Sequence, residues 1–190
     1  MMKLSVKNMV CPRCITAVEK ILEDLHLNPL NIQLGEAVTG IQPDENQMAA
    51  LKQKLKDAGF ELIEDNKAQI IEKIKAVIVE KVHHLAESHI VFSELLSREL
   101  NRDYSALSKL FSANEGITIE QFIILQKIEK AKELLLYNEL TLSEIAYMLG
   151  YSSVAHLSAQ FRKTTGFTPT AFKKQGKNMR QPLDSITKKV

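Results

Sequence analysis

The sequence predicts an α+β protein built from a small mixed domain and a larger all-helical one. Two patterns predict this division. Over the first 65 residues, short stretches of alternating apolar and polar side chains are separated by stretches of helical spacing. After residue 65, apolar side chains recur at the three-to-four-residue spacing of helices. With 190 residues, 45% of them hydrophobic, the chain can bury two cores.

Six elements are expected in the first 65 residues. Alternation predicts the strands, and Pro12 suits the first turn of a helix because its missing N–H costs nothing there. The elements are a strand at 3–7, a helix from Pro12 to about His26, a hairpin over 30–41, a helix from Asp44 to about Gly59 and a strand at 60–63. This order is that of a split βαβ, or ferredoxin-like, sandwich at residues 1–65.

The helical part opens with an amphipathic helix from Ile70 to Val82 and is organised around residues 141–166. Thr141 and Glu144 form a capping-box pattern at the start of a short helix, and Gly150 ends that helix. A second helix with cations near its end follows the turn. Two short helices joined by a glycine-containing turn are typical of a helix-turn-helix.

An internal repeat predicts a second copy of this motif. The residues Leu107, Phe111, Gly116 and Thr118 recur fifty residues later as Leu157, Phe161, Gly166 and Thr168. Residues 93–116 are therefore predicted to form a first helix-turn-helix, and one long helix over 119–137 joins it to the second. Two such motifs in one chain can enter successive major grooves of DNA without dimerisation.

The second motif contains the string SEIAYMLGYSS followed by HLSAQFRKTTGFTP, between residues 143 and 169. These residues resemble the second helix-turn-helix of AraC-type transcription regulators. The resemblance implies an all-α DNA-binding domain over residues 66–180, followed by a basic tail at 181–190. It also implies double-stranded DNA as the partner.

The resemblance further implies which side chains contact DNA. The family's base-reading positions fall on Ser105, Ser108 and Lys109 in the first motif, and on Val154, Ala155, His156, Ser158 and Ala159 in the second. Large polar readers, which make bidentate pairs with bases, are mostly missing from these positions. Lys109 is the strongest base-contact candidate, with a phosphate contact as an equal alternative. Val154 has a core role as its alternative.

The charge distribution agrees with a nucleic-acid partner. Residues 1–65 carry a net charge of −3, whereas residues 151–190 hold 8 Lys/Arg against 1 Asp/Glu, a net charge of +7. Such a local basic excess fits contacts to phosphates. Arg162 and Lys163 are therefore expected to position the DNA backbone rather than to read bases. For Lys188 and Lys189, a solvated tail is the alternative.

The first 65 residues resemble heavy-metal-associated domains. Met9-x-Cys11-x-x-Cys14 follows the first predicted strand, and Gly59-Phe60 precedes the last, as in that family. The family's usual glycine before the methionine is Asn8 here, and Pro12-Arg13 replaces the commoner small or polar pair. The resemblance implies that Cys11 and Cys14 bind Cu(I) or another soft metal ion.

Residue chemistry alone leaves several roles open for this pair. Two thiolates at a helix N-terminus can bind a soft ion linearly, whereas tetrahedral zinc needs two more ligands. Cys11-Pro12-Arg13-Cys14 also looks like a dithiol redox centre, and an inert pair is the third alternative. His83 and His84 are expected to be solvated or to cap a helix, because adjacent residues of a helix point different ways.

These observations predict a cytoplasmic transcription regulator with a metal-sensing N-terminal domain. Two copies of the chain can form a homodimer through that domain. No catalytic set of residues and no membrane-length apolar run can be picked out, so an enzyme or a membrane protein is not expected. The alternatives are a metal-binding or redox adaptor of the chaperone type that retains a helix-turn-helix core, and a regulator that senses thiol oxidation.

Overall fold

The computed structural model of the chain describes residues 1–84, 90–175, 182–184 and 186. The chain forms two compact units, Met1–Glu80 and Lys81–Val190. Together they make an α+β protein, since the first unit contains a four-stranded sheet and the second is mostly helical. Within the described part of the chain, none of the helices is both long and apolar enough to cross a lipid bilayer.

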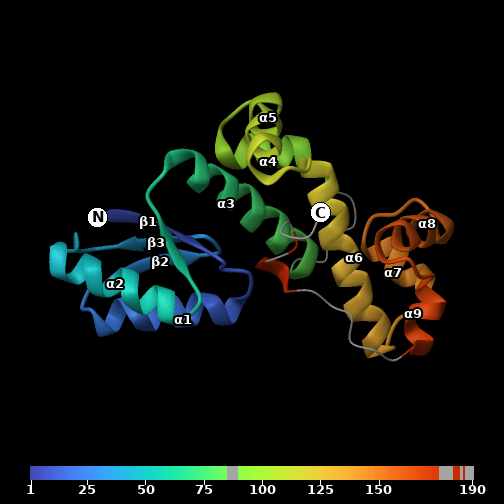
Figure 1. Cartoon of the computed structure of the whole chain (residues 1–190), viewed down its shortest axis with the longest axis horizontal. Helices are drawn as coiled ribbons and strands as arrows, with labels where there is room; N and C mark the ends of the chain where they lie inside the picture. Colours follow the sequence, from blue (N-terminus) through green and yellow to red (C-terminus); the bar gives the residue numbers. More distant parts are fainter. Residues whose placement is uncertain (85–89, 176–181, 185, 187–190) are drawn as a thin grey trace. The chain divides into compact units, whose positions relative to one another are not determined.

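The first unit alternates strands and helices in the predicted order. Its elements are β1 (Met2–Lys7), α1 (Pro12–Asp24), β2 (Pro29–Gln33), β3 (Glu36–Thr39), α2 (Glu45–Asp57), β4 (Glu61–Ile63) and α3 (Asn66–Val79). The strands lie in the order β2-β3-β1-β4, and every neighbouring pair is antiparallel. The order places β1 in the interior of the sheet (Figure 1). The chain runs from β1 into α1, where Cys11 is the N-cap residue and Cys14 lies in the first turn.

The core of the first unit lies between one face of the sheet and the helices α1 and α2. Leu4 and Val6 point to this face from β1, because residues two apart in a strand share a side. They pack with Val18 and Leu22 of α1 and with Leu51 of α2, all fully or almost fully buried. The alternating apolar residues of the predicted strand and the helically spaced apolar residues of the two predicted helices therefore do form this core.

The helix α3 covers the other face of the sheet. It contacts β1 and β4, and its Lys73 donates to the Glu36 carboxylate of β3 at 2.6 Å. Glu36 is only 6% exposed and also pairs with Lys3 at 3.1 Å. Burial raises the pKa of the Glu36 carboxyl, but the hydrogen bonds from Lys73 and Lys3 outweigh it and hold that pKa below its usual range.

The start and end of α3 differ from the expected helix at Ile70–Val82. It begins earlier because the Asp65 carboxylate accepts the Ala68 N–H at 2.8 Å, which caps the helix at its N-terminus. After Val79 the backbone changes to a π-helical turn, η1 (Glu80–His84). A π-helical turn is rare and contains one more residue than an α-helical turn, so the spacing of apolar residues in the sequence does not predict it.

The second unit is organised around one long helix. Its elements after η1 are α4 (Phe92–Leu100), α5 (Tyr104–Glu115), α6 (Ile119–Tyr137), α7 (Leu142–Met148), α8 (Val154–Thr165) and α9 (Pro169–Gln175). Figure 1 shows α4 and α5 at one end of α6, and α7, α8 and α9 at the other. Each pair, α4–α5 and α7–α8, is two short helices joined by a tight turn.

The two halves of the sequence repeat adopt the same local structure. Gly116 ends α5 and Gly166 ends α8, each with a positive φ, 73° and 80°, that favours glycine. Thr118 accepts the Gln121 N–H at 3.1 Å, and Thr168 accepts the Ala171 N–H at 3.2 Å, so each threonine starts the following helix. The repeat in the sequence is thus a repeat of helix ends and caps.

Aromatic residues fix each motif to its own end of α6. Phe111 of α5 packs against Phe122 near the start of α6, with ring centroids 5.6 Å apart. Phe161 of α8 packs edge-on against Phe172 of α9 at 5.4 Å, within a cluster that includes Ile128 and Leu135 of α6. The two motifs are therefore held by separate apolar cores on one rigid helix.

Candidate nucleic-acid interface and cysteine pair

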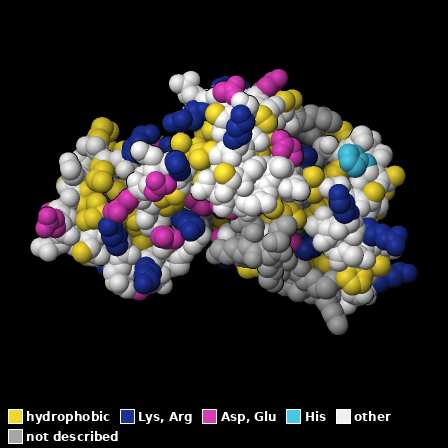
Figure 2. Space-filling model, turned by 45° about the horizontal axis from the view of Figure 1, so that its top comes forward, with side chains coloured by type: hydrophobic (Ala, Val, Ile, Leu, Met, Phe, Trp, Pro, Cys, Tyr) yellow, Lys and Arg dark blue, Asp and Glu magenta, His cyan; other side chains and the backbone are white. Residues whose placement is uncertain are grey.

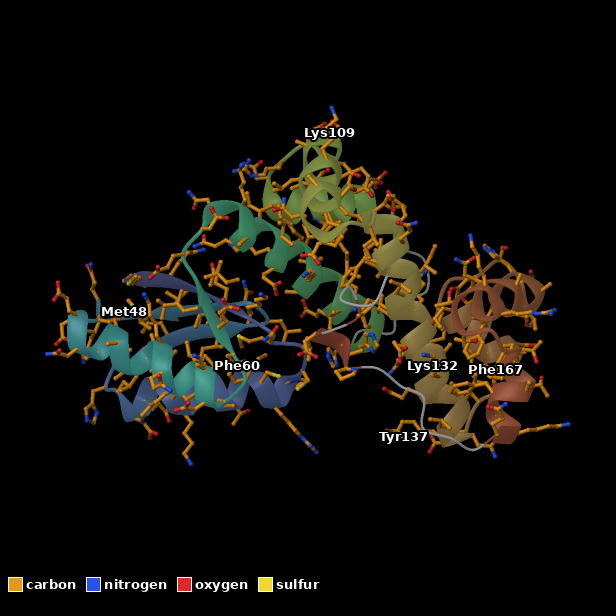
Figure 3. All side chains as sticks on the ribbon, in the orientation of Figure 1. Met48, Phe60, Lys109, Lys132, Tyr137 and Phe167 are labelled. Carbon is orange, nitrogen blue, oxygen red and sulfur yellow. The ribbon has the colours of Figure 1, made fainter. Side chains whose placement is uncertain are left out.

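The candidate residues of the first motif lie on α5 and differ in exposure. Lys109 is exposed and its side chain points outward from the middle of α5 (Figure 3), whereas Ser108 is partly buried. Ser105 is exposed, but its hydroxyl donates to the Asp103 carboxylate at 2.5 Å, next to the backbone N–H groups that Asp103 caps. Lys109 is thus the candidate on α5 with a long side chain directed at solvent.

The candidate residues of the second motif lie along α8. The exposed ones are Ala155, His156, Ala159, Arg162 and Lys163. Ser158 is partly buried, and Val154 packs against the apolar cluster of Leu157 and Phe161. The core role given as the alternative for Val154 therefore fits its contacts better than base reading.

Cations gather at the α8–α9 end of this unit. Arg162 and Lys163 are exposed in the last turn of α8, and Lys173 and Lys174 are exposed in the last turn of α9. Figure 2 shows Lys and Arg side chains protruding at this end of the second unit. Exposed cations at the ends of two helices of one unit suit the phosphates of a nucleic acid.

His156 is held in one orientation at the start of α8. Its Nδ1 lies 3.1 Å from the Ser152 hydroxyl, and its backbone N–H donates to the Ser153 hydroxyl at 3.1 Å. The imidazole also packs edge-on against the ring of Tyr151, with centroids 5.2 Å apart. The Ser152 contact uses Nδ1 of this exposed side chain, so Nε2 is the ring nitrogen that can meet a base or a phosphate.

Tyr151 connects this turn to the central helix. The Lys127 ammonium of α6 lies 5.5 Å from the centre of the Tyr151 ring, a cation–π distance. Burial lowers the pKa of Lys127 and raises the pKa of Tyr151 to about 12. The buried Tyr151 hydroxyl has no hydrogen-bond partner among the described residues, so the ring, rather than the hydroxyl, makes the contacts that hold the turn.

The two cysteines of the first unit face each other at the start of α1. Their Sγ atoms are 3.1 Å apart, both are free, and both are partly exposed. Cys11 is the N-cap residue of α1, and Cys14 follows one turn later. Burial raises the pKa of the Cys14 thiol, and the hydrogen bond with Cys11 raises it further.

The pair offers a small set of ligands. In the described residues, no group of three or more His, Cys, Asp or Glu side chains is placed to hold a metal ion. Met9, next to the pair in sequence, is only 3% exposed and packs into the core of the first unit. The donor set is therefore two sulfurs, which suits a soft cation with low coordination number and does not suit tetrahedral zinc.

Sequence reasoning missed a buried polar junction in the second unit. The Gln126 side chain of α6 is fully buried, with its Oε1 2.9 Å from His83 Nε2 and its Nε2 donating to the Leu183 carbonyl at 3.4 Å. The prediction of a solvated His83 is wrong, because this histidine is partly buried and bonded to α6. A polar Gln126 within the apolar stripe of α6 was the available signal.

The expected basic tail at 181–190 lies largely outside the described residues. Of the part that is described, Ile186 is only 3% exposed and Leu183 is the residue bonded to Gln126. Lys188 and Lys189 fall outside the described residues. The described part of this segment therefore includes buried contacts.

Comparisons with known proteins agree with this geometry. Residues 96–175 match a protein family described as a helix-turn-helix domain. The probable transcriptional regulator LumQ of Photobacterium leiognathi is 33% identical over 63 residues, 33% of this chain and 25% of LumQ. The xylose operon regulatory protein of Escherichia coli K12 is 36% identical over 69 residues, 36% of this chain and 18% of that protein.

A solved structure gives the same result for the fold. The C-terminal domain of AraT, a response regulator from Geobacillus stearothermophilus, is 27% identical, with a TM-score of 0.51 over 58% of this chain and 88% of that domain. This chain spans only 25% of LumQ and 18% of the xylose operon protein, so the similarity concerns one domain and not whole proteins.

Proposed function

We propose that this chain, whose C-terminal unit holds an AraC-type helix-turn-helix domain with homologues among AraC-family regulators, is itself a regulator that binds double-stranded DNA. The observation that carries the proposal is the pair of matched helix-turn-helix motifs, each fixed by its own aromatic core to one end of α6. The helices α5 and α8 are the recognition helices in this proposal.

The length of α6 supports simultaneous binding by both motifs. Its 19 residues span about 28 Å at about 1.5 Å per residue. Successive major grooves on one side of B-DNA are about 34 Å apart. A rigid helix of this length suits a single chain that places α5 and α8 in neighbouring grooves.

The side chains divide into two roles. Arg162 and Lys163 supply charge for phosphates, which fixes the register on DNA without reading sequence. Lys109 and the oriented His156 are the exposed polar side chains long enough to reach base edges from the candidate positions. Ala155 and Ala159 offer small apolar contacts, for example to thymine methyl groups.

Neutralising both Arg162 and Lys163 to alanine is expected to weaken binding to every DNA sequence. Because each lost phosphate contact releases one fewer counterion, the slope of log affinity against log salt should fall by about 2. Gel shifts with the full chain over a series of salt concentrations measure this slope. Lys20 and Lys56 of the first unit, changed together to alanine, provide a control with the same charge change.

Selection from a random DNA library tests Lys109 separately. If Lys109 reads guanine, Lys109→Ala should relax the preference at one base pair, by about 1–3 kcal/mol, in DNA selected from a random library. An equal loss on all sequences would assign Lys109 to the backbone. If the unmodified chain fails to bind DNA at every salt concentration tested, the regulator proposal is wrong. The metal-binding or redox adaptor is then the alternative that remains.

For the first unit, we propose a ferredoxin-like domain that senses a soft metal ion, such as Cu(I), through Cys11 and Cys14. The βαββαβ order and the strand order β2-β3-β1-β4 support the fold. The two thiols at the start of α1 support the site. A bound soft cation would draw both sulfurs onto one centre and so fix the loop before α1.

Changing Cys11 or Cys14 to serine is expected to remove tight binding of Ag(I) or Cu(I) while leaving the helix content unchanged. A hydroxyl is a poor ligand for soft cations, and serine at the Cys11 position is itself a good N-cap. Competition with a colorimetric Cu(I) chelator under anaerobic conditions measures the affinity, and light scattering of the loaded chain reports any dimer. Unchanged affinity in the double variant would place the metal site elsewhere.

A further inference from the structure

The two cysteines are already close enough for a reaction between their sulfur atoms. Cys14 lies one turn after Cys11, and its backbone N–H donates to the Cys11 carbonyl at 2.9 Å. The Sγ atoms are 3.1 Å apart. Because a sulfur–sulfur bond is about 2.05 Å long, the two atoms need to approach by only about 1 Å. Small side-chain rotations can supply this movement without a change in the fold.

The surroundings hold both cysteines in this turn. Pro12 lies between them at the start of the helix and fixes its own φ there. On the other side, Asn8 takes a left-handed φ of 71°, and its amide donates to the Gly59 carbonyl at 3.0 Å. Met9, between Asn8 and the pair, is buried in the core. The two thiols therefore meet in a turn that is fixed from both ends.

We infer that Cys11 and Cys14 form a reversible intramolecular disulfide, and that formation of this bond prevents the two thiols from binding a metal ion. The first part rests on the geometry alone. The second part rests on the proposed metal-sensing function, because a disulfide leaves no thiolate to bind a cation. The first unit would then respond to a soft metal ion only under conditions that keep thiols reduced.

The oxidant in this inference is a low-molecular-weight disulfide, RSSR. The thiolate of one cysteine attacks a sulfur of RSSR, forms a mixed disulfide and displaces one RS⁻. The thiolate of the other cysteine attacks the protein sulfur of that mixed disulfide and displaces the second RS⁻. The two protons lost by the protein thiols end on two RSH molecules. Two electrons have passed from the cysteine pair to RSSR.

The short distance favours the internal bond over competing products. The second cysteine is held beside the first, so its effective concentration exceeds that of a free thiol or a second chain in solution. Both cysteines are partly exposed, so RSSR can reach them. The mixed disulfide is therefore expected to be short-lived, and disulfide-linked dimers are expected to be minor.

The test equilibrates the full, reduced chain anaerobically with graded ratios of oxidised to reduced glutathione. The remaining thiols are trapped with a maleimide and counted by intact mass. The expected result is a single transition from two labels to none, with the mass lower by two hydrogen atoms and the chain monomeric on a non-reducing gel. Excess dithiothreitol should restore both labels. Persistent labels, a lasting glutathione adduct or a linked dimer would each overturn the inference.

Matched variants and a metal probe complete the test. Cys11→Ser and Cys14→Ser each keep one thiol, so each should retain its label or carry one glutathione, and neither should lose label by an internal bond. The oxidised chain should bind Ag(I) at least about tenfold more weakly than the reduced chain, because its thiolates are gone; equal binding would overturn the gating. DNA affinity of the reduced chain is measured separately. If the reduced chain does not bind DNA, the proposed regulator is wrong, whereas the disulfide inference still depends only on the thiol counts.

Discussion

Replacing Phe161 by alanine is expected to lower the free energy of unfolding of the second unit by about 3–5 kcal/mol. Phe161 is fully buried and packs edge-on against Phe172 in the cluster that fixes α8 to α6. Removing its ring deletes the transfer energy of the side chain and leaves a cavity that rigid neighbouring helices fill only in part. A loss of this size is a large fraction of the stability of a typical domain.

Chemical denaturation followed by far-UV circular dichroism measures the effect. Tyr147→Ala provides the control, since Tyr147 is an aromatic residue of the same motif but is 67% exposed, and its loss should cost less than about 0.5 kcal/mol. Phe111→Ala should resemble Phe161→Ala, because Phe111 has the same place in the first motif. A Phe161→Ala variant as stable as Tyr147→Ala would contradict the aromatic core described for the second motif.

Local signals explain why so much of this fold is predictable from the sequence. The capping threonine and glutamate at Thr141 and Glu144 form the predicted capping box, with the Thr141 N–H donating to the Glu144 carboxylate at 2.7 Å. Glycine at 116 and 166 ends a helix in both halves of the repeat. Such signals act within four or five residues, so they can be read directly from the chain.

The candidate site divides along the same line. The exposure of Lys109, Arg162 and Lys163 follows from helical periodicity once the apolar stripe is assigned. The orientation of His156 does not, because it depends on the Ser152 hydroxyl and the Tyr151 ring, whose positions the turn geometry decides. Base preference depends on such details, so the amino-acid sequence indicates the proposed recognition surface without indicating which DNA sequence that surface would read.

Long-range polar contacts account for the largest omission. His83 and Gln126 are 43 residues apart and meet only after the second unit has folded. A histidine next to another histidine gives no sign that one of them is buried. The π-helical turn η1 adds to this, because it rotates His83 away from the direction that α-helical spacing predicts. The consequence is a titratable group inside the folded unit.

The stability of the second unit is expected to decrease as the pH falls from about 6.5 to about 4, and His83 is expected to supply about 2–3 kcal/mol of this decrease. Burial lowers the pKa of His83 to about 4. The Gln126 hydrogen bond and Glu133 oppose that shift, while Lys130 and His84 add to it. In the unfolded chain the same imidazole takes up its proton near pH 6.5.

The sign follows from which state binds the proton first. Between the two pKa values the unfolded chain is protonated at His83 and the folded chain is not, so acid favours unfolding throughout this interval. Above about pH 6.5 both states are neutral and the contribution is complete; below about pH 4 both are protonated and His83 causes no further loss. His83→Gln removes the titration while keeping an amide N–H that can donate to Gln126.

The difference between the His83→Gln variant and the unmodified chain isolates this group, because carboxylates elsewhere titrate equally in both. Urea unfolding at about pH 7.5 and about pH 4.5 gives the free energy of unfolding of both proteins. On acidification, the difference between them should shift by about 2–3 kcal/mol in favour of His83→Gln. His84→Gln keeps His83 and its contact with Gln126, so this variant should still lose stability on acidification. If His83→Gln and the unmodified chain lose stability in parallel, His83 is protonated at its ordinary pKa in the folded unit, and the junction with Gln126 is open to water.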